Sequence, residues 1–454
     1  MVEPRIFRQY DIRGVWGKDL DAGAVDAIGR AFAVYLKDRT ESGAPAVSIG
    51  YDARKSSPEI LQTLQVALNS SGVSVVDIGM CPTPLQYFSL HRLDVQGGIM
   101  ITGSHNPPEF NGLKLSVGKE TLHGEAIQEI RKLIESGRKT GGSGASQKHE
   151  IIPDYMEYMK ERFRDPGFGG LRVVVDSGNG TGGVVGPGLM RDLGAEVTEL
   201  YSEPDGNFPN HHPDPVVLEN LRDLIAKVRE TGAHVGIGYD GDSDRIGVVD
   251  EDGEVVWGDR LMIIFSRDIL KDNPGATVIG EVKCSQTLYD DIRARGGNPI
   301  MWKTGHSLIK KKMKDEGALL AGEMSGHIFF SHRYLGFDDA IYAGLRLAEI
   351  MKRSGEPYSV KKLLRGVPEM VSTPEIRVDC PDEKKFEVAE KMKEAFKDYP
   401  VVDIDGVRVN FPEGWGLLRA SNTQPALVMR FEARDEASLK KIQETVEGEL
   451  KKII

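Results

Sequence analysis

The chain has 454 residues, 40% of them hydrophobic, a length that predicts about three domains rather than a single packed core. Its 58 basic and 69 acidic residues give a net charge of −11, which argues against nucleic acid as a partner. The three cysteines are far apart, the N-terminus lacks a signal-like apolar segment, and no run of about twenty apolar residues occurs. We therefore expect a cytoplasmic protein without a membrane span.

Residues 46–102 alternate short apolar runs with amphipathic stretches, a pattern typical of an α/β sheet covered by helices. The same rhythm restarts near residues 171 and 276, which indicates successive α/β units. The predicted strands are 46–49, 73–78 and 98–102, and the predicted helices are 58–70 and 84–93. Polar or turn-rich segments at 139–148, 251–253 and 368–374 are the expected boundaries between units.

Ser104 lies in the segment TGSHNPP, directly after a predicted strand. Ligands bind at strand ends in α/β sheets, and a neighbouring glycine exposes the hydroxyl to an electrophile. A serine hydrolase is a weaker interpretation, because the loop lacks the G-x-S-x-G pattern. If residues 113–117 return as a hairpin strand, Lys114 can lie beside Ser104; the alternation does not require Lys114 to be buried.

The segment DGDSDR places Asp240, Asp242 and Asp244 at alternate positions between two predicted strands. Clustered carboxylates repel each other unless a cation joins them, and hard oxygen ligands suit Mg²⁺ or Ca²⁺. A calcium-binding EF-hand is rejected, because Arg245 stands at the position that needs glycine and the flanking segments are strands rather than helices.

A rival class of function comes from Gly178, Gly180 and Gly183, which match the G-x-G-x-x-G pattern of dinucleotide-binding proteins, with Glu199 about twenty residues further on. Pro187 and Gly188 interrupt the helix that should receive the pyrophosphate. A strand, turn and helix without a phosphate is therefore favoured, and the dehydrogenase alternative remains open.

Two later segments carry further polar groups. GEMSGH, at 322–327, offers a carboxylate, a hydroxyl and an imidazole that suit sugar hydroxyls, and RASNTQP, at 419–425, can cradle a phosphate with one guanidinium and small hydrogen-bonding side chains. Lys283 and His306, which precede GEMSGH in the sequence, add basic groups nearby.

Together, TGSHNP, DGDSDR, GEMSGH and RASNTQP resemble the α-D-phosphohexomutase superfamily, and in detail its bacterial phosphomannomutase/phosphoglucomutase group. The resemblance runs nearly end to end. It implies a heart-shaped molecule with three related mixed-sheet α/β domains and a smaller C-terminal α+β domain. With the boundaries above, the expected domains are 1–150, 151–254, 255–368 and 369–454.

The resemblance also implies an activity, the interconversion of hexose 1-phosphate and hexose 6-phosphate through a phosphoserine and a hexose 1,6-bisphosphate. Ser104 would carry the phosphoryl group and bind Mg²⁺ together with Asp240, Asp242 and Asp244. Lys114 or His306 would handle the hydroxyl proton, with Arg245 as a further catalytic cation. The expected substrate contacts are Tyr10, Arg13, Lys283, His306, Glu323, Ser325, His327, Arg419, Ser421, Asn422 and Thr423.

Hexose phosphates are thus the expected partners, hexose 1,6-bisphosphate the expected activator, and a monomer or weak dimer the expected state. A glucosamine phosphate mutase of the same superfamily remains an alternative, although its sugar loop more often carries Gln where this chain has Met324.

Overall fold

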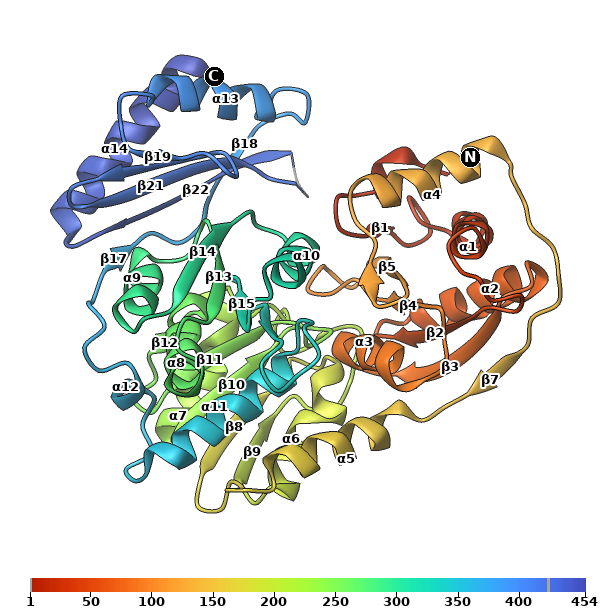
Figure 1. The fold of residues 1–454 in the computed structure, drawn as a ribbon, viewed down its shortest axis with the longest axis horizontal. Helices are drawn as coiled ribbons and strands as arrows, with labels where there is room; N and C mark the ends of the chain where they lie inside the picture. Colours follow the sequence, from red (N-terminus) through yellow and green to blue (C-terminus); the bar gives the residue numbers. More distant parts are fainter. Residues whose placement is uncertain (1, 423–424) are drawn as a thin grey trace.

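The computed structural model describes residues 2–422 and 425–454. Within those residues the strands form four sheets, one in each of four consecutive units (Figure 1). The first three units are mixed α/β layers and the last is a smaller α+β unit, arranged with a heart-shaped outline. The expected fold class is therefore confirmed.

The first unit has the strand order β1-β5-β4-β2-β3-β7, with β6 beside β5. Strand β2 runs parallel to β3 and β4, whereas β5 returns antiparallel beside β4, as the predicted hairpin requires. Every element predicted between residues 46 and 102 is present. The unit comprises η1 (Pro4–Ile6), β1 (Ile12–Val15), α1 (Ala22–Lys37), β2 (Ala46–Tyr51), α2 (Ser57–Ser70), β3 (Ser74–Met80), α3 (Thr83–Arg92), β4 (Gly97–Ile101), β5 (Phe110–Val117), β6 (Glu120–Thr121), α4 (Glu125–Ser136) and β7 (Ser146–Lys148).

The second unit has the order β12-β11-β10-β8-β9, in which β8, β9 and β10 are parallel and β11 and β12 antiparallel. The strands flanking the DGDSDR segment are therefore β10 and β11, as expected. The unit comprises α5 (Ile151–Phe163), β8 (Arg172–Asp176), η2 (Thr181–Val184), α6 (Gly186–Asp192), β9 (Glu196–Leu200), η3 (Leu218–Leu221), α7 (Arg222–Thr231), β10 (Val235–Tyr239), β11 (Ile246–Asp250) and β12 (Val255–Val256).

The third unit has the order β14-β13-β15-β16, again parallel except for its last strand. Its elements are α8 (Gly258–Asp272), β13 (Thr277–Glu281), α9 (Gln286–Ala294), β14 (Asn298–Trp302), α10 (His306–Glu316), β15 (Leu320–Gly322), β16 (Ile328–Phe330), α11 (Ala340–Ser354) and α12 (Val360–Leu363).

The fourth unit is an antiparallel sheet, β17-β22-β21-β20-β19 with β18 beside β22, covered by two helices. Its elements are β17 (Val371–Ser372), β18 (Ile376–Asp379), α13 (Lys385–Ala395), β19 (Val401–Val402), β20 (Val407–Phe411), β21 (Gly414–Ala420), β22 (Ala426–Ala433) and α14 (Glu436–Ile453).

In all four units the loop with chemical side chains lies in an antiparallel hairpin. The loops join β4 to β5, β10 to β11, β15 to β16 and β21 to β22. Strands β4, β10 and β15 are buried along their whole length, because their sequences are continuously apolar or glycine, and the polar residues follow at their ends. The repeat that is hard to see in the sequence is therefore a repeat of topology.

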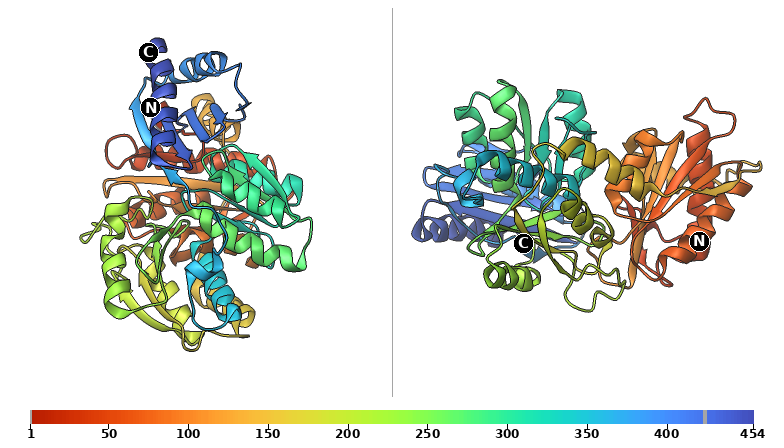
Figure 2. Two further views of the ribbon diagram at one scale, coloured as in Figure 1. Left: turned by 90° about the vertical axis from the view of Figure 1, so that its left-hand side faces the viewer. Right: turned by 90° about the horizontal axis from the view of Figure 1, so that it is seen from below.

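The second and third units share one hydrophobic core, in which Ile237 of β10 and Phe330 of β16 lie with Leu345 of α11. The fourth unit has a core of its own. The first unit packs against this core through Phe88 of α3, and the chain passes from β7 into α5 beside it (Figure 2). Among the helices of the described residues, none has the length and apolar character needed to cross a membrane.

Asp339 fixes the start of α11 and joins two units. One of its oxygens accepts the backbone N–H of Tyr342, 2.8 Å away, and the other accepts the hydroxyls of Tyr155 in α5 and Tyr334, at 2.8 and 2.6 Å. Burial raises the pKa of Asp339 to about 6, although these hydrogen bonds lower it.

The Asp339→Asn variant tests this buried carboxyl. Because the pKa is higher in the folded protein than the ordinary value of about 3.9, the stabilising contribution is complete below about pH 4 and lost as the pH rises through about 6. Asparagine does not titrate. The unfolding temperature of the variant minus that of wild type should therefore be several degrees higher at pH 7 than at pH 5. Asp435→Asn, at the exposed start of α14, is the matched control. Equal differences at both pH values would contradict the assignment.

Candidate active site

Ser104 follows β4 in a left-handed backbone conformation, with φ 49°. Its hydroxyl donates to Asp240 Oδ2 at 3.1 Å and lies 3.1 Å from His105 Nδ1. The residue is 3% exposed. The first and second units therefore meet at this hydroxyl.

The carboxylates of Asp240, Asp242 and Asp244 are all buried and lie close enough to share a cation, with ligand atoms within 4.8 Å of one another. Burial and the two neighbouring carboxylates raise the pKa of Asp240 well above its ordinary value. Among the described residues, Asp242 Oδ1 and Asp244 Oδ1 are buried without a hydrogen-bond partner. Orphaned carboxylate oxygens beside a serine hydroxyl are the donor set of a hard divalent cation, so the residues fit Mg²⁺.

Lys114 of β5 balances part of this negative charge. Its Nζ lies 2.9 Å from Asp242 Oδ2 and 2.5 Å from Asp244 Oδ2. The side chain is buried, which the strand alternation did not require, because the two ion pairs hold it inside. Although burial lowers the pKa of Lys114, the two carboxylates raise it well above its usual range, so the lysine remains a cation.

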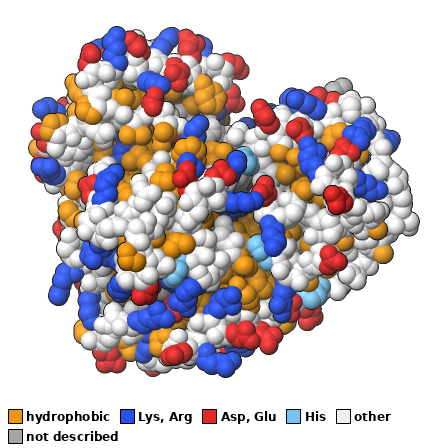
Figure 3. All heavy atoms as spheres, viewed as in Figure 1, with side chains coloured by type: hydrophobic (Ala, Val, Ile, Leu, Met, Phe, Trp, Pro, Cys, Tyr) orange, Lys and Arg blue, Asp and Glu red, His pale blue; other side chains and the backbone are white. Residues whose placement is uncertain are grey.

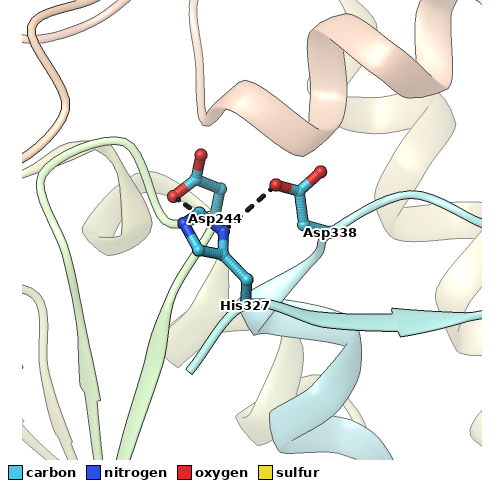
Figure 4. A group of neighbouring side chains, drawn as sticks. All are labelled: Asp244, His327 and Asp338. Atoms are coloured by element: carbon cyan, nitrogen blue, oxygen red, sulfur yellow. Dashed lines mark ion pairs between the residues drawn. The ribbon is translucent and has the colours of Figure 1, made fainter. Parts of the chain in front are cut away.

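Two histidines gather around Asp338. His327 Nδ1 lies 3.1 Å from Asp338 Oδ2 and 3.6 Å from Asp244 Oδ1, as Figure 4 shows. His306, at the start of α10, lies 3.7 Å from the same oxygen of Asp338 and stacks on His327 with ring centroids 5.5 Å apart. Burial and the nearby Lys310 ammonium lower the pKa of His306 well below its usual range, so its imidazole is neutral.

Two arginines complete this part of the site. Arg245 donates from Nε to His327 Nε2 at 2.9 Å and lies 4.0 Å from Asp214. Arg13 of β1 donates to Asn106 Oδ1 at 2.6 Å, just beyond Ser104, and also pairs with Asp11.

A second group of polar side chains surrounds the β15–β16 hairpin. Glu323 accepts the backbone N–H of Gly305 at 3.0 Å and the hydroxyl of Ser325 at 3.1 Å. Lys283, just after β13, pairs with Glu375 at 3.2 Å and Glu281 at 3.5 Å. The Lys283 ammonium holds the pKa of Glu375 down to about 2.

Tyr10 connects the first unit to the third and fourth. Its hydroxyl donates to Thr304 O at 2.8 Å and accepts from Asn422 Nδ2 at 2.8 Å. Its ring contacts His306 edge-on at 5.7 Å and so links the two groups of side chains.

Arg419 lies near the end of β21, and its guanidinium donates to Asp405 Oδ2 at 2.9 Å, an oxygen that also accepts the N–H of Thr304. Ser421 and Asn422 follow in the same hairpin. Thr423, the remaining predicted phosphate contact, lies outside the described residues.

Figure 3 shows the surface hollowed between the first unit, on the right, and the other three, with Lys, Arg, Asp, Glu and His side chains at the hollow. The described residues of all four predicted segments are thus brought together, each by a hairpin of a different unit.

The glycine-rich segment after β8 has a different place from that in a dinucleotide-binding fold. Thr181 donates its N–H to Gly241 O at 3.0 Å, and a Cβ on Gly180 would lie 2.6 Å from the same oxygen. A turn and the short helices η2 and α6 follow, as the favoured interpretation predicts. The glycines allow this segment to pack tightly behind the acidic hairpin.

Sequence reasoning missed three groups that hold the predicted residues in place. Asp338 lies beside both histidines, Asp405 holds Arg419, and Arg54 lies behind Ser104. The Asp-Asp pair at 338–339 before a helix signals an N-cap, which Asp339 provides. The role of Asp338 could not be recognised from the sequence, because it depends on tertiary contacts.

Comparison with known proteins agrees with this geometry. Family models match nearly the whole chain: phosphoglucomutase/phosphomannomutase alpha/beta/alpha domains I, II and III at residues 4–141, 153–253 and 257–370, and the C-terminal domain at 375–449. Four such domains in this order define the α-D-phosphohexomutase superfamily. Within it, the chain belongs to the phosphoglucomutase/phosphomannomutase family.

Individual relatives match end to end. The chain is 49% identical over 450 residues to the phosphomannomutase/phosphoglucomutase of Pseudomonas syringae pv. tomato, covering 99% of this chain and 95% of that one. It is 45% identical over 446 residues to the phosphoglucomutase of Neisseria gonorrhoeae, covering 96% and 95%. A solved phosphoglucomutase/phosphomannomutase family protein from Burkholderia thailandensis is similar with a TM-score of 0.92 and 43% identity, covering 100% and 98%.

The Asp242→Asn variant tests the acidic cluster. Removing one of three carboxylates should weaken Mg²⁺ binding by at least about tenfold, measured by calorimetric titration, because even groups behind metal ligands contribute that much. Thr83 and Thr102 hydroxyls, which donate to Asp242 Oδ2, can still donate to the amide oxygen, so the fold should survive. Asp250→Asn, at the other end of β11, is the control and should bind Mg²⁺ as wild type does. An unchanged titration of Asp242→Asn would show that the cluster is structural.

Proposed function

We propose that this protein interconverts hexose 1-phosphate and hexose 6-phosphate, with mannose or glucose as the sugar, through a phosphoserine at Ser104 and a hexose 1,6-bisphosphate intermediate. The observation that carries the proposal is the hydrogen bond from the buried Ser104 hydroxyl to Asp240 within the cluster of three carboxylates. The relatives named phosphomannomutase/phosphoglucomutase and phosphoglucomutase support the reaction and the sugar class.

Asp240, Asp242 and Asp244, with an oxygen of Ser104, would hold Mg²⁺. When bound, the cation supplies charge neutralisation to the phosphoryl group being transferred. Lys114 and Arg245 add positive charge from the protein, and both are held by carboxylates of the same region. Phosphoryl transfer depends chiefly on such charge neutralisation and in-line positioning.

In the first step a sugar hydroxyl attacks the phosphorus of phosphoserine. The new bond joins phosphorus to the sugar oxygen, the bond to Ser104 Oγ breaks, and the product is the 1,6-bisphosphate. The hydroxyl proton goes to the neutral imidazole of His306, whereas Lys114 stays charged. Ser104 Oγ takes up one proton as its phosphate leaves, which balances the proton that the sugar hydroxyl gives up.

The intermediate then turns around and returns its other phosphate to Ser104, so one cradle must hold the distal phosphate in both orientations. We assign this cradle to Arg419, Ser421 and Asn422, with Thr423 in the same hairpin. We assign Glu323 and Ser325 to the sugar hydroxyls. The remaining groups assigned to the substrate are Tyr10, Arg13, Lys283, His306 and His327.

Hexose 1,6-bisphosphate would act as activator, because it phosphorylates Ser104 whenever the phosphate has been lost. We further propose a cytoplasmic protein that acts on hexose phosphates without nucleic acid or membrane partners, as a monomer or weak dimer. The domain boundaries near residues 150, 254 and 368 also remain a proposal. The boundary near residue 254 lies at the end of the second sheet, where β12 (Val255–Val256) pairs with β11.

The Ser104→Ala variant tests the carrier. With Mg²⁺ and a trace of bisphosphate, wild type should convert mannose 1-phosphate or glucose 1-phosphate, whereas the variant should lose at least about a thousandfold in kcat/KM. Intact mass should show one phosphate on wild type and none on the variant. Ser116→Ala, a buried serine on β5 away from the Ser104 loop, is the control. Full activity of Ser104→Ala would refute the mechanism, and faster turnover of glucosamine 1-phosphate would redirect the substrate assignment.

The Arg419→Lys variant tests the distal cradle. Lysine keeps the charge but lacks the planar fork that binds phosphate oxygens in pairs, so the bisphosphate should escape more often and leave Ser104 dephosphorylated. Added glucose 1,6-bisphosphate should then restore much of the lost rate in progress curves. Arg434→Lys, exposed in the same unit, should behave as wild type. If Arg419→Lys keeps native phosphoserine occupancy and gains nothing from the activator, Arg419 does not hold the intermediate.

A further inference from the structure

Arg54 is a buried guanidinium that lies directly behind the Ser104 loop. It follows β2 and is 1% exposed. Its Nε donates to Asp52 Oδ2 at 3.0 Å, and the Phe208 ring of the second unit covers it at 5.3 Å. A charge so deep in the protein persists only where partners satisfy it.

Four backbone carbonyls accept the other N–H groups of Arg54. They belong to Ser104 at 2.9 Å, Asn106 at 2.6 Å, Pro107 at 2.6 Å and Phe110 at 2.9 Å. A guanidinium has five N–H groups, and here each has an acceptor. The one side chain therefore gathers the whole turn between β4 and β5.

Asp52 secures the other side of the serine. Its Oδ2 accepts the N–H of Gly103 at 3.0 Å, and its Oδ1 accepts the hydroxyl of Ser57 at 2.8 Å. The Asp52–Arg54 pair thus holds the N–H of Gly103, just before Ser104, and the four carbonyls between Ser104 and Phe110.

This grip explains how Ser104 keeps its left-handed backbone. A residue with a side chain rarely adopts φ 49°, and such conformations persist where the surroundings enforce them. The conformation aims the hydroxyl at Asp240 rather than along the strand.

We propose that Arg54 is a positioning residue for phosphoryl transfer: by binding the four carbonyls it holds the Ser104 oxygen in line with the reacting phosphate. This inference rests on the proposed function, in which Ser104 carries the phosphate. Lysine cannot replace Arg54, because an ammonium has three N–H groups and no planar fork with which to reach all the acceptors.

The Arg54→Lys variant tests the proposal. Because small misplacements of a reacting group cost about a hundredfold in rate, kcat should fall by about that factor. The KM for glucose 1-phosphate should stay within about threefold, since the sugar and distal phosphate are assigned to other hairpins. Transfer from glucose 1,6-bisphosphate to Ser104, followed by intact mass, should slow by the same factor as kcat.

Arg346→Lys is the matched control. Arg346 is an equally buried guanidinium, paired with Asp268 and Glu349 in a region of α11 that does not contact the Ser104 loop. This variant should unfold at a lower temperature, but its kcat per folded molecule should match that of wild type. If Arg54→Lys behaves in the same way, Arg54 is merely structural and the proposal is overturned.

Asp52→Asn provides a second variant should Arg54→Lys fail to fold. Asparagine removes the negative charge that pairs with Arg54, and its amide can also put an N–H group where Oδ2 accepts two N–H groups. The variant should therefore lower kcat with little change in KM. Unchanged kcat would overturn the proposal. If wild type takes no phosphate from the bisphosphate onto Ser104, the proposed function is refuted as well. If wild type is phosphorylated normally and the variants are phosphorylated at the same rate, only the Arg54 inference is refuted.

Discussion

The structure depends on the electrostatic cost of burying Asp240, Asp242 and Asp244 together. A short hairpin holds three like charges away from water, where charge repulsion is strong, and the pKa of Asp240 rises accordingly. Cations and hydroxyls from the first unit offset that repulsion, among them Lys114 and Ser104. The first and second units must therefore dock accurately before the acidic hairpin is stable, and the reactive serine belongs to the interface that docks.

The third and fourth units contribute to the same site in a similar way. Each contributes one antiparallel hairpin, so residues as far apart as Tyr10 and Asn422 meet by a direct hydrogen bond. Side chains at the ends of four sheets are thereby brought to one region of the molecule. The third and fourth units hold Lys283 and Arg419 with Glu375 and Asp405, carboxylates that keep the cations oriented toward the same region.

Much of this arrangement could be predicted from sequence because local patterns determine it. Continuous apolar runs ending in polar loops correctly predicted β2, β3, β4 and the acidic hairpin. The burial of Lys114 could not be predicted, because strand alternation says which face a side chain occupies but not what covers that face. The same holds for Asp338 and Arg54, whose partners lie on other elements. The glycines at 178–183 permit close approach of a protein hairpin rather than of a nucleotide, in agreement with the favoured interpretation.

The central claim, that Ser104 carries the phosphate through turnover, can be tested most directly by a rapid-quench experiment. Enzyme carrying labelled phosphate on Ser104 would be mixed with unlabelled glucose 1-phosphate and excess Mg²⁺, and the label followed over milliseconds. The account predicts that label leaves Ser104 for the bisphosphate and then the 6-phosphate at a rate no slower than kcat. Product that forms while the label stays on Ser104 would contradict it.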